Sequence, residues 1–106
     1  MEMLQDRLVL ICTDMISNAG EGRGLVHEAL EMALKEDYKG AAAKLDDAEQ
    51  YLAEAHRIQF EELMAPQRKG VNIPVDLLLL HAMDLLMVST SERDMLHKVV
   101  QAGLAR

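Results

Sequence analysis

Residues Leu77–Val88 read LLLLHAMDLLMV, an apolar run that only His81 and Asp84 interrupt. Its many leucines, with methionine and alanine, favour a helix. Because such a helix is apolar all the way round, it has to be covered all the way round. Two further helices from the same chain would cover only part of its circumference. The run therefore predicts an oligomer that holds this helix in its core, with the rest of each chain forming the outer wall.

The segments before this run also carry the spacing of helices. An apolar residue recurs every three or four positions near the start of the chain, at Leu4, Leu8, Ile11 and Met15. A second, heptad-like stripe follows Asp37, a candidate N-cap, and consists of Ala41, Leu45, Ala48, Leu52, Ala55, Gln59 and Leu63. Two cations and a glycine at residues 68–70 are typical of a helix end.

The third helix is predicted to have Pro74 at its first position, Asp76 in its first turn, and its end near Gly103. Residues 18–24 read NAGEGRG, and these three glycines taken alone predict a break or kink in the first helix. The chain has 106 residues, is half apolar and has only three aromatic side chains. We therefore expect one all-α domain over residues 1–106, a bundle of three long antiparallel helices.

Charge and composition exclude several classes of function. A net charge of −7 argues against a sequence-independent nucleic-acid binder, since phosphate contacts need an excess of lysine and arginine. The longest apolar run is too short and too interrupted to insert into a membrane. The single cysteine, Cys12, excludes an intramolecular disulfide and is expected to be a small buried apolar residue. With no secretory signal visible at the N-terminus, we expect a cytoplasmic protein.

His81 and Asp84 stand three residues apart, which places them on one face of the helix, on successive turns. An ionisable pair in an apolar helix is costly unless it is satisfied. One interpretation is a buried polar pair that fixes the register of an oligomer core. The other is a reactive imidazole with a nearby carboxylate. The pattern alone leaves both open.

At this point the chain resembles the lactose/cellobiose-specific IIA components of the bacterial phosphoenolpyruvate-dependent sugar phosphotransferase system. The last helix of that family usually carries His-(Ala/Gly)-Gln-Asp-His-Leu-Met, where residues 81–87 read HAMDLLM. Ala19-Gly20 followed by Arg23 resembles the family's Ala-Gly-x-x-Arg segment. Residues 53–56, AEAH, with Gln59 resemble its Ala-Glu-Ala-His segment and the glutamine after it. The resemblance covers nearly the whole chain, and the three segments together are specific.

The resemblance implies a protomer of three helices that assembles as a homotrimer, with nine helices and the third helix of each chain inside. It also implies that the first helix continues through residues 18–24. His81 is assigned to the phosphorylated position, which accepts a phosphoryl group from the phosphocarrier protein HPr. The group then passes to a cysteine of the cognate IIB protein during uptake of a β-linked disaccharide. An imidazole suits this chemistry, because it is a nucleophile and largely neutral at pH 7.

Asp84 matches an aspartate that lies near the trimer axis in the family. Three carboxylates on one axis repel each other and need a cation, protons or water between them. The resemblance implies a divalent cation such as Mg²⁺ with a structural role, and carboxylate oxygens are suitable ligands for it.

Two positions depart from the family pattern. Met83 stands where the family has Gln, and Leu85 where it has a second His. Both changes remove polar groups that could orient the imidazole or the phosphoryl group. A second hypothesis is therefore a degenerate paralogue that acts as a non-catalytic trimeric scaffold or regulator. Among the other histidines, His56 is expected to be a structural hydrogen-bonding residue, and His27 and His97 are expected to be surface residues.

Overall fold

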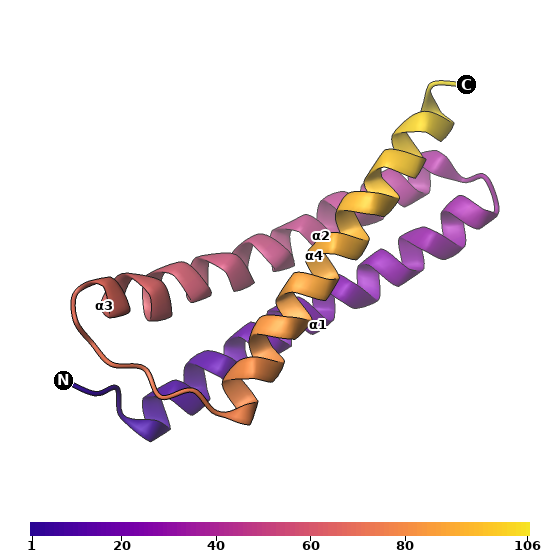
Figure 1. The fold of residues 1–106 in the computed structure, drawn as a ribbon. Helices are drawn as coiled ribbons and strands as arrows, with labels where there is room; N and C mark the ends of the chain where they lie inside the picture. The colour runs from indigo at the N-terminus through magenta and orange to yellow at the C-terminus, as the bar shows by residue number, and fades with distance from the viewer.

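The structure, a computed structural model, describes all residues from 1 to 106 and consists of helices joined by short connections (Figure 1). The elements are α1 (Gln5–Leu34), α2 (Tyr38–Ile58), the π-helical turn η1 (Gln59–Met64), α3 (Ala65–Arg68) and α4 (Leu77–Leu104). α2, η1 and α3 follow one another without a break, so the chain forms three long rods. α1 and α4 point the same way, and α2 runs antiparallel to both (Figure 1). The predicted all-α bundle of three helices is confirmed.

The core consists of two apolar clusters along a bundle that measures 55 × 20 × 16 Å. The larger cluster joins α1, α2 and α4 around Met15, Leu52 and Leu86, and Cys12 is buried within it, as predicted. The smaller cluster lies toward the other end around Leu45 and Val100. Every member of the predicted α2 stripe is buried except Gln59, which is half-buried. No helix is both long and apolar enough to cross a membrane.

α1 is continuous through the glycine-rich residues 18–24, so the break predicted from local propensity is wrong. The continuous helix implied by the family resemblance is confirmed. The physical reason is close packing at Gly22, which is buried against α2. A Cβ there would lie 2.8 Å from Cγ and Cδ2 of Leu52 and 3.2 Å from the carbonyl oxygen of Ala48. Tertiary contact thus outweighs the roughly 1 kcal/mol that each helical glycine costs.

The connections that lead into α2 and α4 both end in a side-chain cap. The predicted cap at Asp37 is confirmed, because its carboxylate accepts a hydrogen bond of 3.0 Å from the backbone N–H of Gly40. The predicted start of the third helix is wrong by three residues. Asp76 is the N-cap rather than a residue of the first turn, and it accepts a hydrogen bond of 2.8 Å from the N–H of Leu79. Pro74 lies before the helix, because Asp76 supplies the acceptor that the first N–H groups of α4 need.

The π-helical turn η1 was not predicted. Ile58 and Leu63 are both buried although they are five residues apart, a spacing that an α-helix would place on different faces. A π turn, with its i→i+5 hydrogen bonds, brings both into the core. Pro66 follows directly, and its ring in a regular α-helix would clash with the carbonyl of residue 62. The wider turn therefore buries both Ile58 and Leu63 and avoids the clash of the Pro66 ring.

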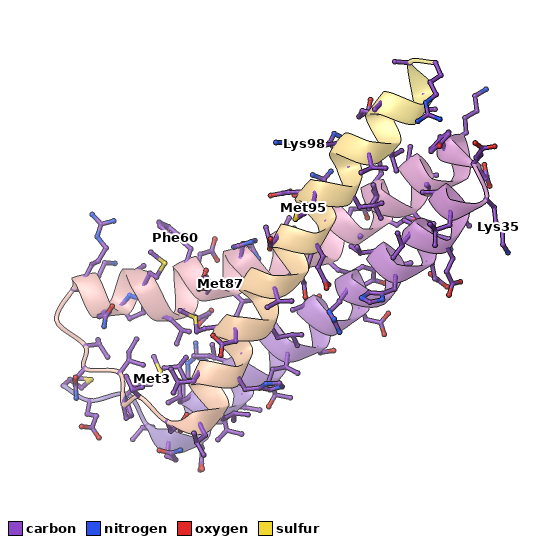
Figure 2. The ribbon with its side chains drawn as sticks, turned by 45° about the vertical axis from the view of Figure 1, so that its right-hand side comes forward. Met3, Lys35, Phe60, Met87, Met95 and Lys98 are labelled. Carbon is purple, nitrogen blue, oxygen red and sulfur yellow. The ribbon has the colours of Figure 1, made fainter.

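One long face of α4 has no partner within the chain. It consists of exposed apolar residues, among them Leu77, Leu80, Met87, Val88, Met95 and Val99 (Met87 and Met95 are labelled in Figure 2). The side chain of Leu77 is 84% exposed and that of Met87 is 68% exposed. Contiguous apolar surface of this kind marks an interaction site in soluble proteins. α1 and α2 thus leave this face of α4 uncovered, as expected for a helix that an oligomer would bury.

Candidate functional site

His81 lies in the second turn of α4, on its uncovered face. The helix positions it there because Ala82 and Leu86 of the same turns are buried against the core, which leaves the imidazole exposed. Its ring makes no hydrogen bond and no ion pair within the chain. A free, exposed imidazole can act as a nucleophile toward a partner that docks on this face.

Asp84 lies three residues further along and is also exposed on this face. No hydrogen bond joins it to His81, so the two do not form the self-satisfied buried pair that one interpretation of the sequence suggested. No three potential ligands of a metal ion gather anywhere in the single chain. A metal site at Asp84 would need carboxylates from several copies, and the predicted Mg²⁺ stays a prediction.

The two residues that depart from the family pattern point to different sides of α4. The Met83 side chain is half-buried toward α2, where its Sδ accepts a hydrogen bond of 3.0 Å from Nε2 of Gln59. Leu85 lies one turn after His81 and packs toward α1. The change at Leu85 therefore alters the surroundings of His81 in the same chain, whereas Met83 faces away from it.

An ion-pair cluster that the sequence did not predict joins α1 to α4 on the side of His81. The Arg23 guanidinium donates from Nε and Nη2 to the Glu92 carboxylate, over 2.9 and 3.3 Å. Nε2 of His27 lies 3.6 Å from the same carboxylate. The hydrogen bond from Arg23 lowers the pKa of Glu92, and in turn the pKa of Arg23 is raised. Arg23 was noted only as part of a motif, because its partner is 69 residues away in the sequence.

Beside this cluster lies an open hollow of 260 Å³, lined by Gly20, Arg23, Gly24, His27 and Leu85. A Cβ at Gly20 or Gly24 would meet nothing within 4 Å, so the α1 backbone is bare at this point. The hollow begins one helical turn from His81, about 6 Å along α4.

His56 lies on the opposite side of α4, between α2 and α4. Its Nε2 is 3.0 Å from Oγ1 of Thr90, which is hydrogen-bonding distance. The expected hydrogen bond of His56 is therefore present, and its structural role stays a prediction. One turn further along, the Arg93 guanidinium pairs with Glu49 at 3.2 Å. These contacts form a polar seam between α2 and α4.

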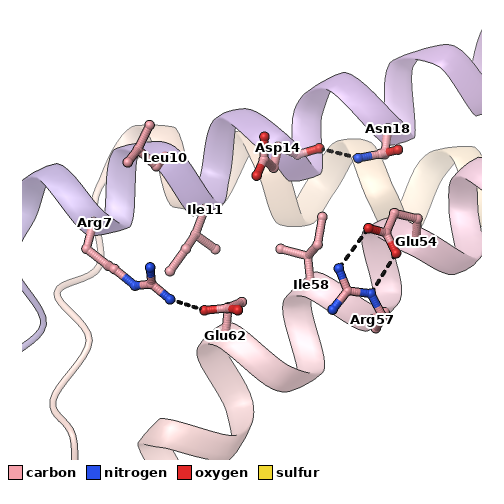
Figure 3. Close-up of a pocket in the computed structure, with 9 residues that line it drawn as sticks. All are labelled: Arg7, Leu10, Ile11, Asp14, Asn18, Glu54, Arg57, Ile58 and Glu62. Atoms are coloured by element: carbon pink, nitrogen blue, oxygen red, sulfur yellow. Dashed lines mark hydrogen bonds and ion pairs between the residues drawn. The ribbon is translucent and has the colours of Figure 1, made fainter.

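The largest hollow, 460 Å³, lies between α1 and α2 and does not include His81 (Figure 3). Its floor is apolar, and its rim carries two arginines that are held by carboxylates of α2 and η1. Arg7 pairs with Glu62, and Arg57 pairs with Glu54 at 2.6 Å (Figure 3). The hydrogen bond from Arg57 lowers the pKa of Glu54. Both guanidinium groups are thus neutralised locally: the Arg7–Glu62 pair ties α1 to η1, and the Arg57–Glu54 pair lies within α2.

Comparison with known proteins agrees with this arrangement. Residues 10–103 match the family described as the lactose/cellobiose-specific IIA subunit of the PTS system. The N,N'-diacetylchitobiose-specific EIIA component of Escherichia coli K12 is 30% identical over 91% of this chain and 82% of its own length. The lichenan-specific phosphotransferase enzyme IIA component of Bacillus subtilis 168 is 31% identical over 92% of this chain and 88% of its own.

Solved structures share the fold. The crystal structure of PtcA from S. mutans superposes with a TM-score of 0.91 at 28% identity, covering 95% of this chain and 98% of that one. The PTS cellobiose-specific enzyme IIA from Bacillus anthracis superposes with a TM-score of 0.85 at 25% identity, covering 97% and 93%. The three-helix fold, the match over residues 10–103 and the identities above therefore place this chain in the lactose/cellobiose-specific IIA family of the sugar phosphotransferase system.

Proposed function

We propose that this chain is a phosphocarrier that uses His81 to relay a phosphoryl group during uptake of a β-linked disaccharide. The observation that carries the proposal is the exposed imidazole of His81, unpaired on the uncovered face of α4 in a chain of this family. The donor is HPr and the acceptor is a cysteine of the IIB component. An exposed position suits both steps, because each partner has to bring its reacting atom against the ring.

The chemistry is two displacements at phosphorus. In the first, a ring nitrogen of His81 attacks the phosphorus of phosphorylated HPr. The new N–P bond forms as the donor's N–P bond breaks, and the donor imidazole leaves with the electron pair. In the second, a cysteine thiolate of IIB attacks the same phosphorus, an S–P bond forms, and His81 regains its electron pair. Positioning and charge stabilisation are what the protein has to supply.

The assembly we propose is a homotrimer with three copies of α4 around a threefold axis. This arrangement would bury apolar side chains of the uncovered face of α4, such as Leu80 and Val88, and would leave α1 and α2 outside. His81, one turn before Leu85 on the side of α4 toward α1, would lie at the edge of that interface and stay accessible to its partners. Asp84 lies on that face, so the axis would bring three carboxylates together. Their oxygens suit a hard divalent cation such as Mg²⁺, which would supply a structural counter-charge.

Labelling tests the relay. The protein is mixed with phosphoenolpyruvate, enzyme I and HPr, and we expect an acid-labile phosphate on His81. His81→Ala should lose the label, whereas the matched control His56→Ala should keep it. Full labelling of His81→Ala would refute the assignment. Light scattering should give three times the chain mass of 11.8 kDa at micromolar concentration, and a stable monomer would refute the trimer.

A non-catalytic scaffold or regulator is the second candidate, and Leu85 favours it. This residue replaces a polar neighbour on the His81 side of α4 with an apolar one. If the wild-type protein takes no label under saturating HPr while it still forms a trimer, the scaffold is the better account. Genes for IIB and IIC components beside this one would instead favour the relay.

A further inference from the structure

We propose that Arg23 is the cation that binds the phosphoryl group on His81, and that Glu92 holds it ready when the phosphoryl group is absent. The inference rests on the proposed role of His81. It goes further by assigning to one residue of α1 the charge stabilisation that the transfer needs.

The first argument is electrostatic. A phosphoryl group adds nearly two negative charges to a chain that already carries −7. Asp84, on the same face and one turn away, adds to the repulsion. Catalysis of phosphoryl transfer depends on a preorganised cation or dipole close to the oxygens. The site therefore needs a positive group that α4 itself does not provide beside His81.

The second argument is position. Most ion-paired lysine and arginine side chains lie elsewhere: Arg7 and Lys44 tie α1 to the α2 rod, Arg57 pairs along that rod, and Arg93 ties α4 to α2. Arg23 is the one lysine or arginine whose ion pair joins α1 to α4, on the side that Leu85 shares with it. Leu85, which lines one hollow together with Arg23, follows His81 by a single turn of α4.

The third argument is the state of the guanidinium. Nε and Nη2 are bound to Glu92, whereas Nη1 donates no hydrogen bond within the chain. The side chain is 40% exposed and borders the hollow beside Gly20 and Gly24, where no side chain blocks it. A phosphoryl group in this hollow could draw the guanidinium from one anion to another without moving the helices. Leu85 contributes no competing polar group there.

A structural tie between α1 and α4 would be the simple alternative, and two variants separate it from phosphoryl binding. Arg23→Ala and Glu92→Gln both break the ion pair, so a purely structural role predicts the same effect for both. Phosphoryl binding predicts opposite effects on the phosphoryl group of His81. Arg23→Ala removes the cation, whereas Glu92→Gln keeps Arg23 and frees it from its carboxylate partner. Arg57→Ala, which removes an arginine paired with Glu54 and Glu61 on the α1–α2 side, is the matched control.

The test uses potassium phosphoramidate, which transfers its phosphoryl group to histidine nitrogen with release of ammonia and needs no protein donor. Phosphorus NMR then follows the second ionisation of the phosphoryl group, and the His81 resonance is identified by its loss in His81→Ala. In Arg23→Ala we expect the midpoint to rise by about one pH unit, because an opposite charge nearby favours the ionised form. In Glu92→Gln the midpoint should stay or fall. In Arg23→Lys, which keeps a positive charge, the midpoint should lie between those of Arg23→Ala and the wild type.

Transfer from HPr provides the second readout, with a fall of about 10²-fold expected in Arg23→Ala and none in Arg57→Ala. An unchanged midpoint in Arg23→Ala overturns the inference, as does an equal rise in Glu92→Gln. A protein that phosphoramidate labels with the predicted shift, but that HPr does not label, would support the phosphoryl site while refuting the proposed relay. Circular dichroism confirms that each variant is folded.

Discussion

Three glycines of α1 lie in one helix but in different surroundings, and they make a stringent test of the packing. Gly22 is buried, and a Cβ there would lie 2.8 Å from two atoms of Leu52, which is itself only 1% exposed. A Cβ at Gly20 or Gly24 would meet nothing. The same substitution, glycine to alanine, should therefore have opposite effects on the free energy of unfolding.

The magnitudes follow from two competing effects. Alanine gains about 0.5–1 kcal/mol over glycine inside a helix, because it restricts the unfolded chain. Overpacking a filled core costs about 1–3 kcal/mol. Gly24→Ala should thus stabilise the protein by about 0.5–1 kcal/mol, whereas Gly22→Ala should destabilise it by about 1–2 kcal/mol. Urea unfolding followed by far-ultraviolet circular dichroism measures both at one protein concentration.

The control is Leu52→Ala, which makes room for the new methyl group. In that background Gly22→Ala should lose its penalty, and the coupling between the two sites should exceed 0.5 kcal/mol or so. If Gly22→Ala stabilises the protein as much as Gly24→Ala does, α1 and α2 do not approach as closely as described. Light scattering on each variant checks that the assembly is unchanged.

The remaining predictions concern ionisable groups. Asp84→Leu should keep the assembly and abolish any change in melting temperature between chelator and added Mg²⁺; dissociation of the assembly would show contacts that the single chain does not contain. The pKa of Glu92 is lowered by Arg23, so the pair stabilises the fold above the ordinary glutamate pKa, and this contribution is lost as the pH falls through the lowered value. The difference in unfolding free energy between the wild type and Glu92→Gln should therefore shrink from about pH 7 to about pH 3, and a constant difference would contradict the assigned pair. Burial, with a smaller effect of Asp76, raises the pKa of the Cys12 thiol, so a disulfide reagent should modify it slowly in the native protein and rapidly in urea; fast native labelling would mean that Cys12 is accessible.

Sequence reasoning reached much of the fold because most of its signals are local. The α2 stripe and the cap at Asp37 depend on residues within a few positions of each other, and both are found as predicted. The start of α4 was misplaced because Pro74 and Asp76 each offer a valid local signal, and only the hydrogen bond to Leu79 distinguishes them. The glycines misled for another reason: the contact that keeps α1 straight comes from Leu52, thirty residues away.

Some residues of the candidate site could be predicted from the sequence and others could not, for the same reason. His81 and Asp84 could be singled out because an ionisable residue in an apolar run is conspicuous, and the family resemblance gave His81 a role. The cluster of Arg23, His27 and Glu92 could not, since its members are unremarkable surface residues until α1 and α4 lie in parallel. A spacing pattern within one helix does not contain the register between two helices.

The π turn at residues 59–64 has a consequence for how this gene can change. A turn closed by i→i+5 hydrogen bonds holds one residue more than an α-helical turn that spans the same step. Elsewhere in α1 or α4, losing a codon would rotate every later side chain by about 100° and turn buried faces outward. Between Gln59 and Met64 the loss of one residue would convert the wide turn into an ordinary one. This segment is therefore where the reading frame can shorten by one codon with the least damage to the core, as long as the proline that follows is also replaced.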